Sequence, residues 1–301
     1  MADDKRHQGN TSSLQQTSAK DSGGVHPQGK PFLGIAIHSF FVIPFLIALS
    51  CILLFSGVRI LTQNQRSAYD FLEDVKVGGL TKRWQSAFEL SKILANPRLI
   101  PQDEQFFSQL SDAFEHARHD DNRTRQYLAL AMGRTGRMEF VKPLQEGLKE
   151  EKEENLTALI YALGMLKQKE AAPALYPYLD HPQPRIRSIA VVALGNIAHP
   201  DSAALLTKAL EDPEPNVQWG AAVSLARLGD AGGREILGEM LDREYWSRFP
   251  QVDDKEQNDL ILMAIEASGS LRDSRLDEKI IYLGKNDPNA KIRFAALEVH
   301  K

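Results

Sequence analysis

Cysteine is almost absent from this chain of 301 residues, in which Cys51 is the only one. A single cysteine cannot form an intrachain disulfide, so covalent cross-links do not hold the fold together. The sequence also lacks a Gly-x-Ser-x-Gly elbow, a His-Glu-x-x-His motif and a phosphate-binding glycine loop. We therefore expect no catalytic residues, no cofactor, no metal and no enzymatic activity.

Neither sign of charge dominates, because the formal net charge is only −4 although 25% of the residues are charged. No basic patch carries interleaved aromatic residues, so we expect no nucleic-acid partner. No window alternates between apolar and polar residues as a half-buried strand would. These absences favour an all-α protein.

What the sequence does contain is a unit that recurs every 31 residues. The string at Ala162–Leu166 returns at Ala193–Ile197 and again at Ser224–Leu228. A fixed period of this size is typical of stacked supersecondary units rather than of one globular core. The register continues in both directions with insertions, one of which surrounds Tyr245–Pro250.

Each unit is predicted to be a pair of helices, a shorter one followed by a longer one. In the longer helix over 184–197, apolar residues recur at the spacing of one helix face; they are Ile186, Ala190, Ala193, Leu194 and Ile197. Acidic residues and prolines separate the units, as in Asp212-Pro213-Glu214-Pro215. Such residues cap or start helices, so these strings mark where one helix ends and the next begins.

The units resemble HEAT-like repeats of the short type found in phycobilisome-lyase-like proteins. The strings Pro184–Gly195 and Pro215–Ala222 carry the resemblance, which covers about Leu80 to Lys301. It implies a right-handed α-solenoid of about six to seven helical hairpins over residues 80–301. Most members of that family are scaffolds or adaptors, and a minority handle bilin chromophores. A seventh unit begins at Pro288, and we expect its second helix to be a polar-ended cap.

The N-terminal region has a different composition. Residues 1–30 are polar and predict a disordered tail, and residues 31–58 contain no charged side chain. Such a run is long enough for a transmembrane helix, which needs about 20 apolar residues. A cleaved signal peptide fits less well because its apolar region is shorter, and a lipoprotein reading conflicts with the apolar residues that follow Cys51. Residues 59–79 are expected to form a juxtamembrane helix or linker, and its amphipathic part, 67–75, could dock on the first repeat.

The predicted span implies a single-pass protein of a bacterial-type inner membrane, in contact with the lipid bilayer through residues 31–58. Lysine and arginine are nearly balanced across the span, with Lys20 and Lys30 before it and Arg59, Arg66 and Lys76 after it. The cations of the tail and the early position of the span favour an orientation with the tail on the inner side of the membrane and the repeats on its outer side.

One face of the longer helices is the predicted partner-binding surface. Opposite the core face of 184–197 lie Ser188, Val191, Val192 and Gly195, where a solvated helix should be polar. In a HEAT stack these helices line the concave side, so an apolar face with aromatic anchors could accept a partner protein. Lateral packing between neighbouring helices is the alternative, and the small residues at 133, 164, 195 and 226 favour it. The candidate partner-binding residues are Trp84, Phe88, Arg125, Tyr161, Arg187, Trp219 and Phe294.

Among these candidates, Trp84 and Trp219 occupy equivalent positions and are expected to be exposed anchors. Arg83, Arg125, Arg187 and Arg293 are also equivalent, as are Lys92, Arg134 and Arg227. The first set could meet an acidic partner or could pair with the acidic turns between units. The histidines and aspartates over 116–121 fit helix capping better than a metal site.

The function predicted from these features is a membrane-anchored HEAT-repeat scaffold or adaptor. It would bind a partner protein of unknown identity through its concave face. An accessory subunit of a membrane complex is an alternative, and a lyase-like protein that handles a chromophore is a second one.

Overall fold

The computed structural model describes residues 41–62, 66–119, 121–150 and 153–299. The chain divides into two compact units, Met1–Gln65 and Arg66–Lys301. The predicted disordered tail over 1–30 lies outside the described residues.

The first unit contains one described helix, α2 (Ile43–Thr62). Its large apolar side chains up to Val58 are exposed on all sides. The described part of the chain nevertheless contains no helix long and apolar enough to cross a membrane. The predicted transmembrane helix over 31–58 is therefore not supported. Residues 31–40, which form its first part, lie outside the described residues, and α2 runs on to Thr62.

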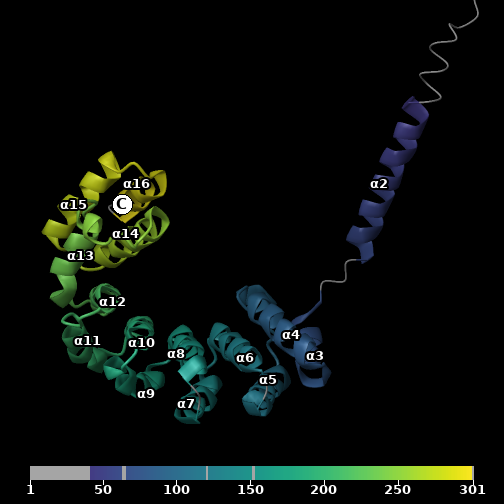
Figure 1. Cartoon of the computed structure of the whole chain (residues 1–301), viewed down its shortest axis with the longest axis horizontal. Helices are drawn as coiled ribbons and strands as arrows, with labels where there is room; N and C mark the ends of the chain where they lie inside the picture. Colours follow the sequence, from purple (N-terminus) through teal and green to yellow (C-terminus); the bar gives the residue numbers. More distant parts are fainter. Residues whose placement is uncertain (1–40, 63–65, 120, 151–152, 300–301) are drawn as a thin grey trace, which may run out of the picture. The chain divides into compact units, whose positions relative to one another are not determined.

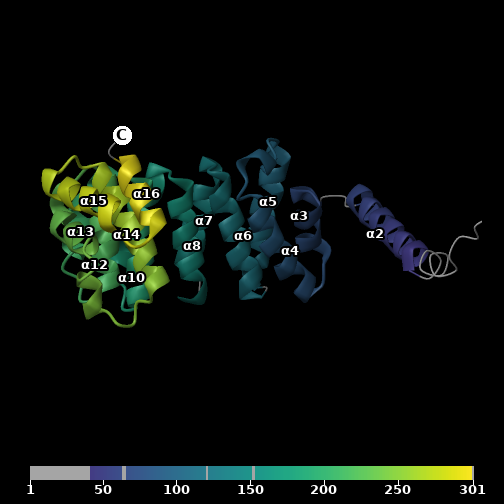
Figure 2. The same cartoon turned by 90° about the horizontal axis from the view of Figure 1, so that it is seen from above.

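The second unit is an array of helix pairs (Figures 1 and 2). Figure 1 shows the second helices from α4 to α12 along the inner side of an arc, and the first helices of the same pairs along its outer side. No strand occurs in the described ranges. Among the described residues there are seven pairs: α3 (Ala68–Val77) with α4 (Leu80–Ile93), α5 (Glu104–His116) with α6 (Asn122–Thr135), α7 (Val141–Glu150) with α8 (Glu153–Leu166), α9 (Ala172–Leu175) with α10 (Pro184–Ile197), α11 (Ala203–Ala209) with α12 (Pro215–Arg227), α13 (Arg234–Met240) with α14 (Asp254–Gly269), and α15 (Ser274–Asn286) with α16 (Ala290–Val299).

The separators read from the sequence start these helices. Asp103 and Asp121 are N-caps whose carboxylates accept hydrogen bonds from the amides of Phe106 and Arg123. Pro184 and Pro215 stand at the first position of α10 and α12, where the missing N–H costs nothing. The prediction that acidic residues and prolines punctuate the units is thus confirmed.

The array begins earlier than Leu80, the start predicted from the repeat register. Ser67 caps α3 with a reciprocal capping box to Asp70, and the apolar side of this helix packs onto the first repeat. Phe71, Leu72 and Val75 are buried there. The predicted docking of the segment 67–75 is confirmed, and α3 serves as the first helix of the first pair.

Neighbouring second helices pack closely against one another at glycines. A Cβ added to Gly164 would lie 2.7 Å from Cα of Ala193 on α10, and one added to Gly133 would lie 2.8 Å from Cα of Ala162 on α8. Val191, which is fully buried, faces Gly220 of the next second helix. Part of the helix face opposite the core therefore packs against neighbouring helices. This lateral packing was the alternative to partner binding in the sequence analysis.

The buried side chains form two clusters, one from Ala68 to Leu225 and one from Trp219 to Ala296. The second cluster includes the aromatic insertion between α13 and α14. The last described helix, α16, exposes Phe294 and Leu297 to solvent, by 66% and 55%. The polar end expected for this helix includes His300 and Lys301, which lie outside the described residues, so the cap stays a prediction.

Candidate functional site

The inner side of the array is hollowed into a groove of about 710 Å³ between α8, α10, α12 and α14. The side chains that line it are those of Tyr161, Pro184, Arg185, Ser188, Ile189, Val192, Asn196, Glu214, Asn216, Trp219, Gly220, Val223, Arg227, Met240, Glu256, Leu260 and Met263. Most of them are apolar. The charged side chains lie along the two edges of the groove, near the N-terminal and C-terminal ends of the helices. We call this hollow the inner groove.

The repeat register explains why these side chains meet. Tyr161, Val192 and Val223 are spaced by 31 residues, so each is supplied by the same position of a successive second helix. The helices present this position because their opposite face is buried, through Ile186 and Ala190 in the case of α10. Tyr161 is 44% exposed, Val192 is half-buried and Val223 is buried. The predicted concave placement of Tyr161, Ser188 and Val192 is confirmed, whereas their role in binding stays a prediction.

Aromatic side chains continue the row on α4 and α6. The rings of Phe88 and Tyr127 meet edge to face, with centroids 5.1 Å apart. Trp84 is half-buried beneath the guanidinium of Arg123, which lies 4.3 Å from its ring centre. Trp84 and Phe88 line a separate depression at this end of the array. Tyr127 was not among the sequence candidates, although counting back 62 residues from Ile189 would have found it.

Trp219 is not an exposed anchor, so that prediction is wrong. The side chain is only 2% exposed, and its Nε1 donates a hydrogen bond of 2.9 Å to the hydroxyl of Tyr245. Trp246 and Phe249 also pack edge to face on its indole, with centroid distances of 4.9 and 5.0 Å. The cover comes from the insertion around the short helix η9 (Tyr245–Arg248), which the repeat register could not place. Trp219 is still part of the lining of the inner groove, although it is almost fully buried.

Arg125 and Arg187 do not act as surface cations either. Arg125 is 1% exposed, donates to the carbonyl of Phe114 and lies over the ring of the same residue. Arg187 holds Asp212 with two hydrogen bonds of 2.7 and 2.8 Å. The arginine side chain is long enough to reach back into the fold, so its helix position alone did not predict exposure.

The equivalent arginines share one structural task. Arg187 donates to the carbonyls of His181 and Pro182, and Arg293 donates to those of Asp287 and Pro288, at the same offsets of six and five residues. Arg83 similarly donates to the carbonyl of Val75. These arginines satisfy the carbonyl groups of the segment that precedes their own helix. Pairing with an acidic turn, the alternative predicted for the set, occurs at Asp212.

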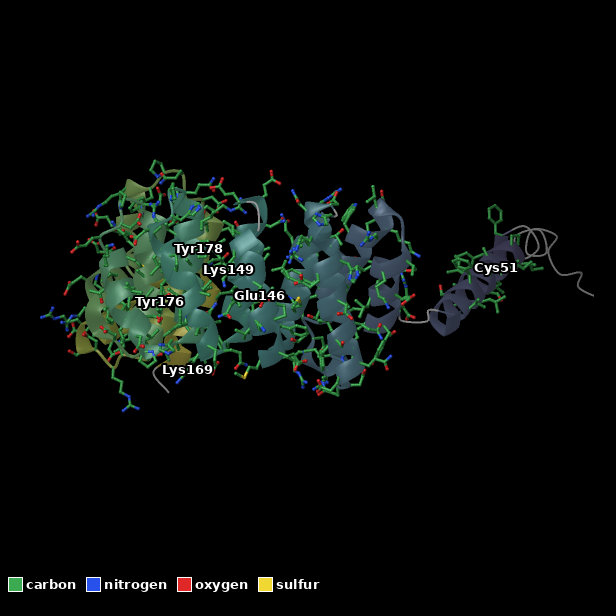
Figure 3. The ribbon with its side chains drawn as sticks, turned by 90° about the horizontal axis from the view of Figure 1, so that it is seen from below. Cys51, Glu146, Lys149, Lys169, Tyr176 and Tyr178 are labelled. Atoms are coloured by element: carbon green, nitrogen blue, oxygen red, sulfur yellow. The ribbon has the colours of Figure 1, made fainter. Side chains whose placement is uncertain are left out.

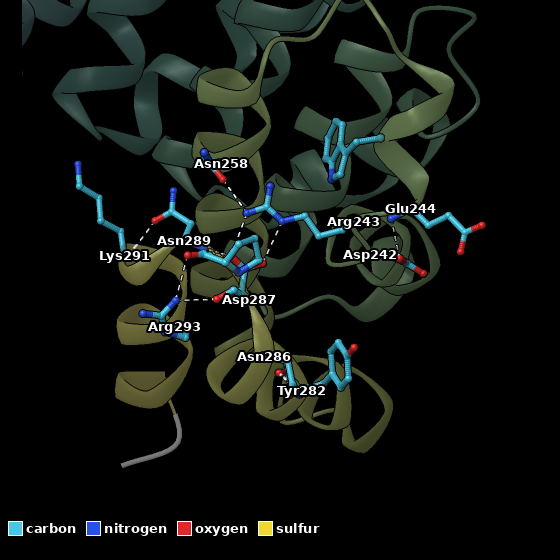
Figure 4. Close-up of polar contacts among 12 residues, drawn as sticks. Asp242, Arg243, Glu244, Asn258, Tyr282, Asn286, Asp287, Asn289, Lys291 and Arg293 are labelled. Carbon is cyan, nitrogen blue, oxygen red and sulfur yellow. Dashed lines mark hydrogen bonds and ion pairs between the residues drawn. The ribbon is translucent and has the colours of Figure 1, made fainter.

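A second polar network, around Asp287, was not found from the sequence (Figure 4). The carboxylate of Asp287 is fully buried and accepts two hydrogen bonds of 2.9 Å from Arg243 and one from the amide of Asn289. Asp212 binds Arg187 and the amide of Glu214 in the same manner. The shared spacing identifies Asp287 as the counterpart of Asp212, displaced by the insertion.

The ion pair with Arg187 also sets the protonation of Asp212. Hydrogen bonds from this guanidinium lower the pKa of the Asp212 carboxyl from its ordinary value of 3.8, although desolvation opposes the change. Burial raises the pKa of the Tyr245 phenol. Neither shift favours acid–base chemistry, because both groups are engaged in structural hydrogen bonds. No group of three or more potential metal ligands exists among the described residues.

The outer side of the array differs from the groove. Figure 3 shows Glu146, Lys149, Lys169, Tyr176 and Tyr178 on the layer of first helices. Lys149 and Lys169 are exposed, whereas Tyr178 donates a hydrogen bond to the carbonyl of Leu148. Phe294, on α16, lines neither the inner groove nor the depression at Trp84.

Comparison with known sequences finds a similarity in the central repeats. A family profile described as HEAT repeats matches residues 110–188 and 173–251. Residues 110–251 are therefore similar to HEAT repeats. No curated protein sequence matches the chain.

Solved structures share the architecture of this HEAT-like array. The complex of CpcE and CpcF of phycocyanin lyase from Nostoc sp. PCC7120 is 22% identical, with a TM-score of 0.57 over 79% of this chain and 88% of that chain. An engineered protein is 19% identical, with a TM-score of 0.44 over 66% of this chain and 95% of that chain. A computationally designed armadillo repeat protein for modular peptide recognition is 16% identical, with a TM-score of 0.38, and 76% of this chain and 98% of that chain are covered. The first likeness shows the fold of the HEAT-like array, in agreement with the all-α solenoid predicted from the period.

Proposed function

We propose that this HEAT-like protein is a scaffold that binds a partner protein in the inner groove. The observation that carries the proposal is an apolar surface where solvated helices should be polar. Tyr161 is 44% exposed, and Ile189 and Val192 are half-buried on the same wall of a groove of about 710 Å³. Apolar clefts with aromatic side chains are common sites for partner helices and extended peptides.

We also propose that α2 attaches this scaffold to a lipid bilayer. From Ile43 to Val58 the helix carries no charged side chain, and Phe45, Ile52, Leu54 and Phe55 are between 62% and 70% exposed. Leaving so much apolar surface in water costs roughly 25 cal/mol per Å². A bilayer would cover this surface and would raise the local concentration of the scaffold near membrane-bound partners. In this arrangement the tail lies inside a bacterial-type inner membrane and the repeats lie outside.

Site-specific photo-crosslinking tests the groove. Benzoylphenylalanine in place of Tyr161 should give discrete adducts on the full chain in its native cells, and Val192→Arg in the same chain should abolish them. The same probe in place of Tyr282, which is 66% exposed on α15 and does not line the inner groove, is the matched control. Equal adducts at both positions, or none at position 161, would contradict the proposed groove.

Cysteine labelling and extraction test the attachment and its direction. Asp201 has an 81% exposed side chain, so Asp201→Cys in a Cys51→Ser chain provides one accessible thiol on the repeats. A membrane-impermeant maleimide should label it in intact spheroplasts, and labelling only after lysis would reverse the orientation. Alkaline carbonate should leave the full chain in the membrane pellet and should release an Ile52→Arg/Leu54→Arg variant. Release of the unaltered chain would exclude anchoring by α2.

The two alternatives predict other results. An accessory subunit that makes its contacts through α2 would still co-purify with its complex after the repeats were removed. A lyase-like protein that handles a chromophore would show new visible absorbance when a bilin is added to the purified chain.

A further inference from the structure

A row of cations follows one edge of the inner side of the array. Lys92, Arg134 and Arg227 stand at equivalent positions near the C-terminal ends of α4, α6 and α12, and we call them the basic edge. Asn196 occupies the equivalent position on α10, and it lines the inner groove together with Arg227. Asn196 and Arg227 each follow an apolar residue of the groove lining, Val192 and Val223, by one helical turn, and Lys92 follows Phe88 at the same spacing.

Two of these cations have no acidic partner among the described residues. Arg134 donates to the carbonyl of Ser91, and Arg227 donates to the side-chain oxygen of Asn196 at 2.8 Å. Neither guanidinium forms an ion pair with any carboxylate in the described ranges. Lys92 pairs only with Glu89 on its own helix, through side chains that are 53% and 41% exposed. A pair so exposed is worth little and is easily exchanged for another carboxylate.

The opposite edge carries both signs of charge, with one arginine and two glutamates in the lining of the groove. Arg185, Glu214 and Glu256 line the groove near the N-terminal ends of α10, α12 and α14. Glu154, near the start of α8, already accepts a hydrogen bond from Asn122. The two edges therefore differ in charge, and the apolar row of Phe88, Tyr161 and Val192 runs between them.

We propose that the inner groove selects a partner segment that is both apolar and acidic. Its apolar side chains would pack on the row through Tyr161 and Val192, and its carboxylates would bind Arg134 and Arg227 along the basic edge. Guanidinium–carboxylate contacts are strong hydrogen bonds that add orientation as well as attraction. The inference rests on the proposed groove and deepens it by naming the chemistry of the partner.

Cations at the C-terminal end of a helix also complement its dipole, a role that needs no partner. That role predicts a loss of stability when the cations are removed, but it predicts no change in which peptides bind. Peptide selection separates the two roles.

A library of random 12-residue peptides displayed on phage should be panned against the purified full chain in detergent micelles. We expect the enriched peptides to combine aromatic or aliphatic residues with an excess of aspartate and glutamate. Synthetic fluorescent copies should bind about tenfold more weakly to the Arg134→Gln/Arg227→Gln variant, mainly through faster dissociation. The Lys149→Gln/Lys169→Gln variant makes the same change in net charge on the outer layer, and it should bind as the unaltered chain does.

The outcomes separate this inference from the proposed groove. Peptides that lose binding to Val192→Arg, but contain no excess of acid and ignore Arg134→Gln/Arg227→Gln, would leave the groove intact and overturn the acidic specificity. Peptides that ignore Val192→Arg, or the absence of any enrichment, would overturn both. Equal weakening by the two glutamine variants would reduce the effect to net charge and would also overturn the inference.

Discussion

The indole nitrogen of Trp219 and the hydroxyl of Tyr245 are joined by a buried hydrogen bond of 2.9 Å, across an insertion that breaks the period of the array. The bond fixes the aromatic insertion against α12, and Trp246 and Phe249 complete the contact. The space between α12 and α14 is thereby filled by rings rather than by the small residues that separate earlier second helices. The aromatic rings thus join α12 to α14, whereas glycines join the earlier second helices to one another.

Removing Trp219 should therefore destabilise the fold rather than only weaken partner binding. Trp219→Ala is expected to lower the free energy of unfolding by about 4 kcal/mol, because it leaves a cavity in the second core cluster. Tyr245→Phe should cost about 1 kcal/mol, the usual worth of one hydrogen bond. Urea unfolding followed by tryptophan fluorescence and circular dichroism measures both. A Trp219→Ala chain as stable as the unaltered one would show that the insertion does not cover this residue.

Two glycines in equivalent helices should respond to alanine in opposite ways. Alanine is the better helix former by about 1 kcal/mol, so Gly220→Ala, whose Cβ would lie 3.4 Å from Val191, should raise the free energy of unfolding. At Gly164 the added Cβ would lie 2.7 Å from Cα of Ala193, so Gly164→Ala should lower it by about 1–3 kcal/mol. Urea midpoints of the two variants provide the comparison. A gain at both positions would mean that neighbouring helices can separate freely.

The Arg187–Asp212 ion pair should make stability depend on pH in the acidic range. The pKa of Asp212 is lowered in the folded chain, so the unfolded chain binds more protons between the folded value and the ordinary value of 3.8. The stabilisation is complete above the ordinary pKa and is lost as pH falls through the folded one. Asp212→Asn should remove about 2 kcal/mol at pH 7, and its difference from the unaltered chain should shrink below pH 4. A difference that stays constant from pH 7 to pH 3 would contradict the assignment.

The Arg243–Asp287 pair (Figure 4) offers a contrast between a buried and an exposed ion pair. Arg243→Met would leave the fully buried Asp287 carboxylate without its guanidinium, at a cost of about 3 kcal/mol. Arg248→Met removes an arginine that is 68% exposed and 4.0 Å from Glu239, so it should cost less than about 0.5 kcal/mol. Thermal unfolding of the two variants at pH 7 tests the difference. Equal losses of stability would indicate that burial does not determine how much each ion pair contributes to stability.

Much of the fold could be predicted from the sequence because period, caps and apolar face all report local structure. The 31-residue register placed Tyr161 and Val192 on the inner side, and the acidic and proline strings placed the helix starts. Contacts from outside the register could not be predicted in this way. The burial of Trp219 depends on the insertion at Tyr245–Arg248, and that of Arg125 depends on a long side chain that turns back to Phe114.

The start of the array was missed for a related reason. The segment at 68–77 does not carry the repeated string, so only its amphipathic pattern hinted that it packs on α4. The uneven charge of the two groove edges was visible in the sequence only in part. Lys92, Arg134 and Arg227 were found to be equivalent, but only the folded chain shows that Arg134 and Arg227 have no acidic partner among the residues that the structure describes.

The bare backbone at Gly133, Gly164 and Gly195 has a consequence that reaches the surface. Because each of these residues brings one second helix against the next, they set the spacing with which Tyr161, Val192 and Val223 follow one another along the groove. A partner segment bound as proposed would have to match this spacing with its own side chains. An alanine in place of one of these glycines would add a methyl group beneath the groove. It would alter the spacing of the groove side chains without replacing any residue that lines the groove.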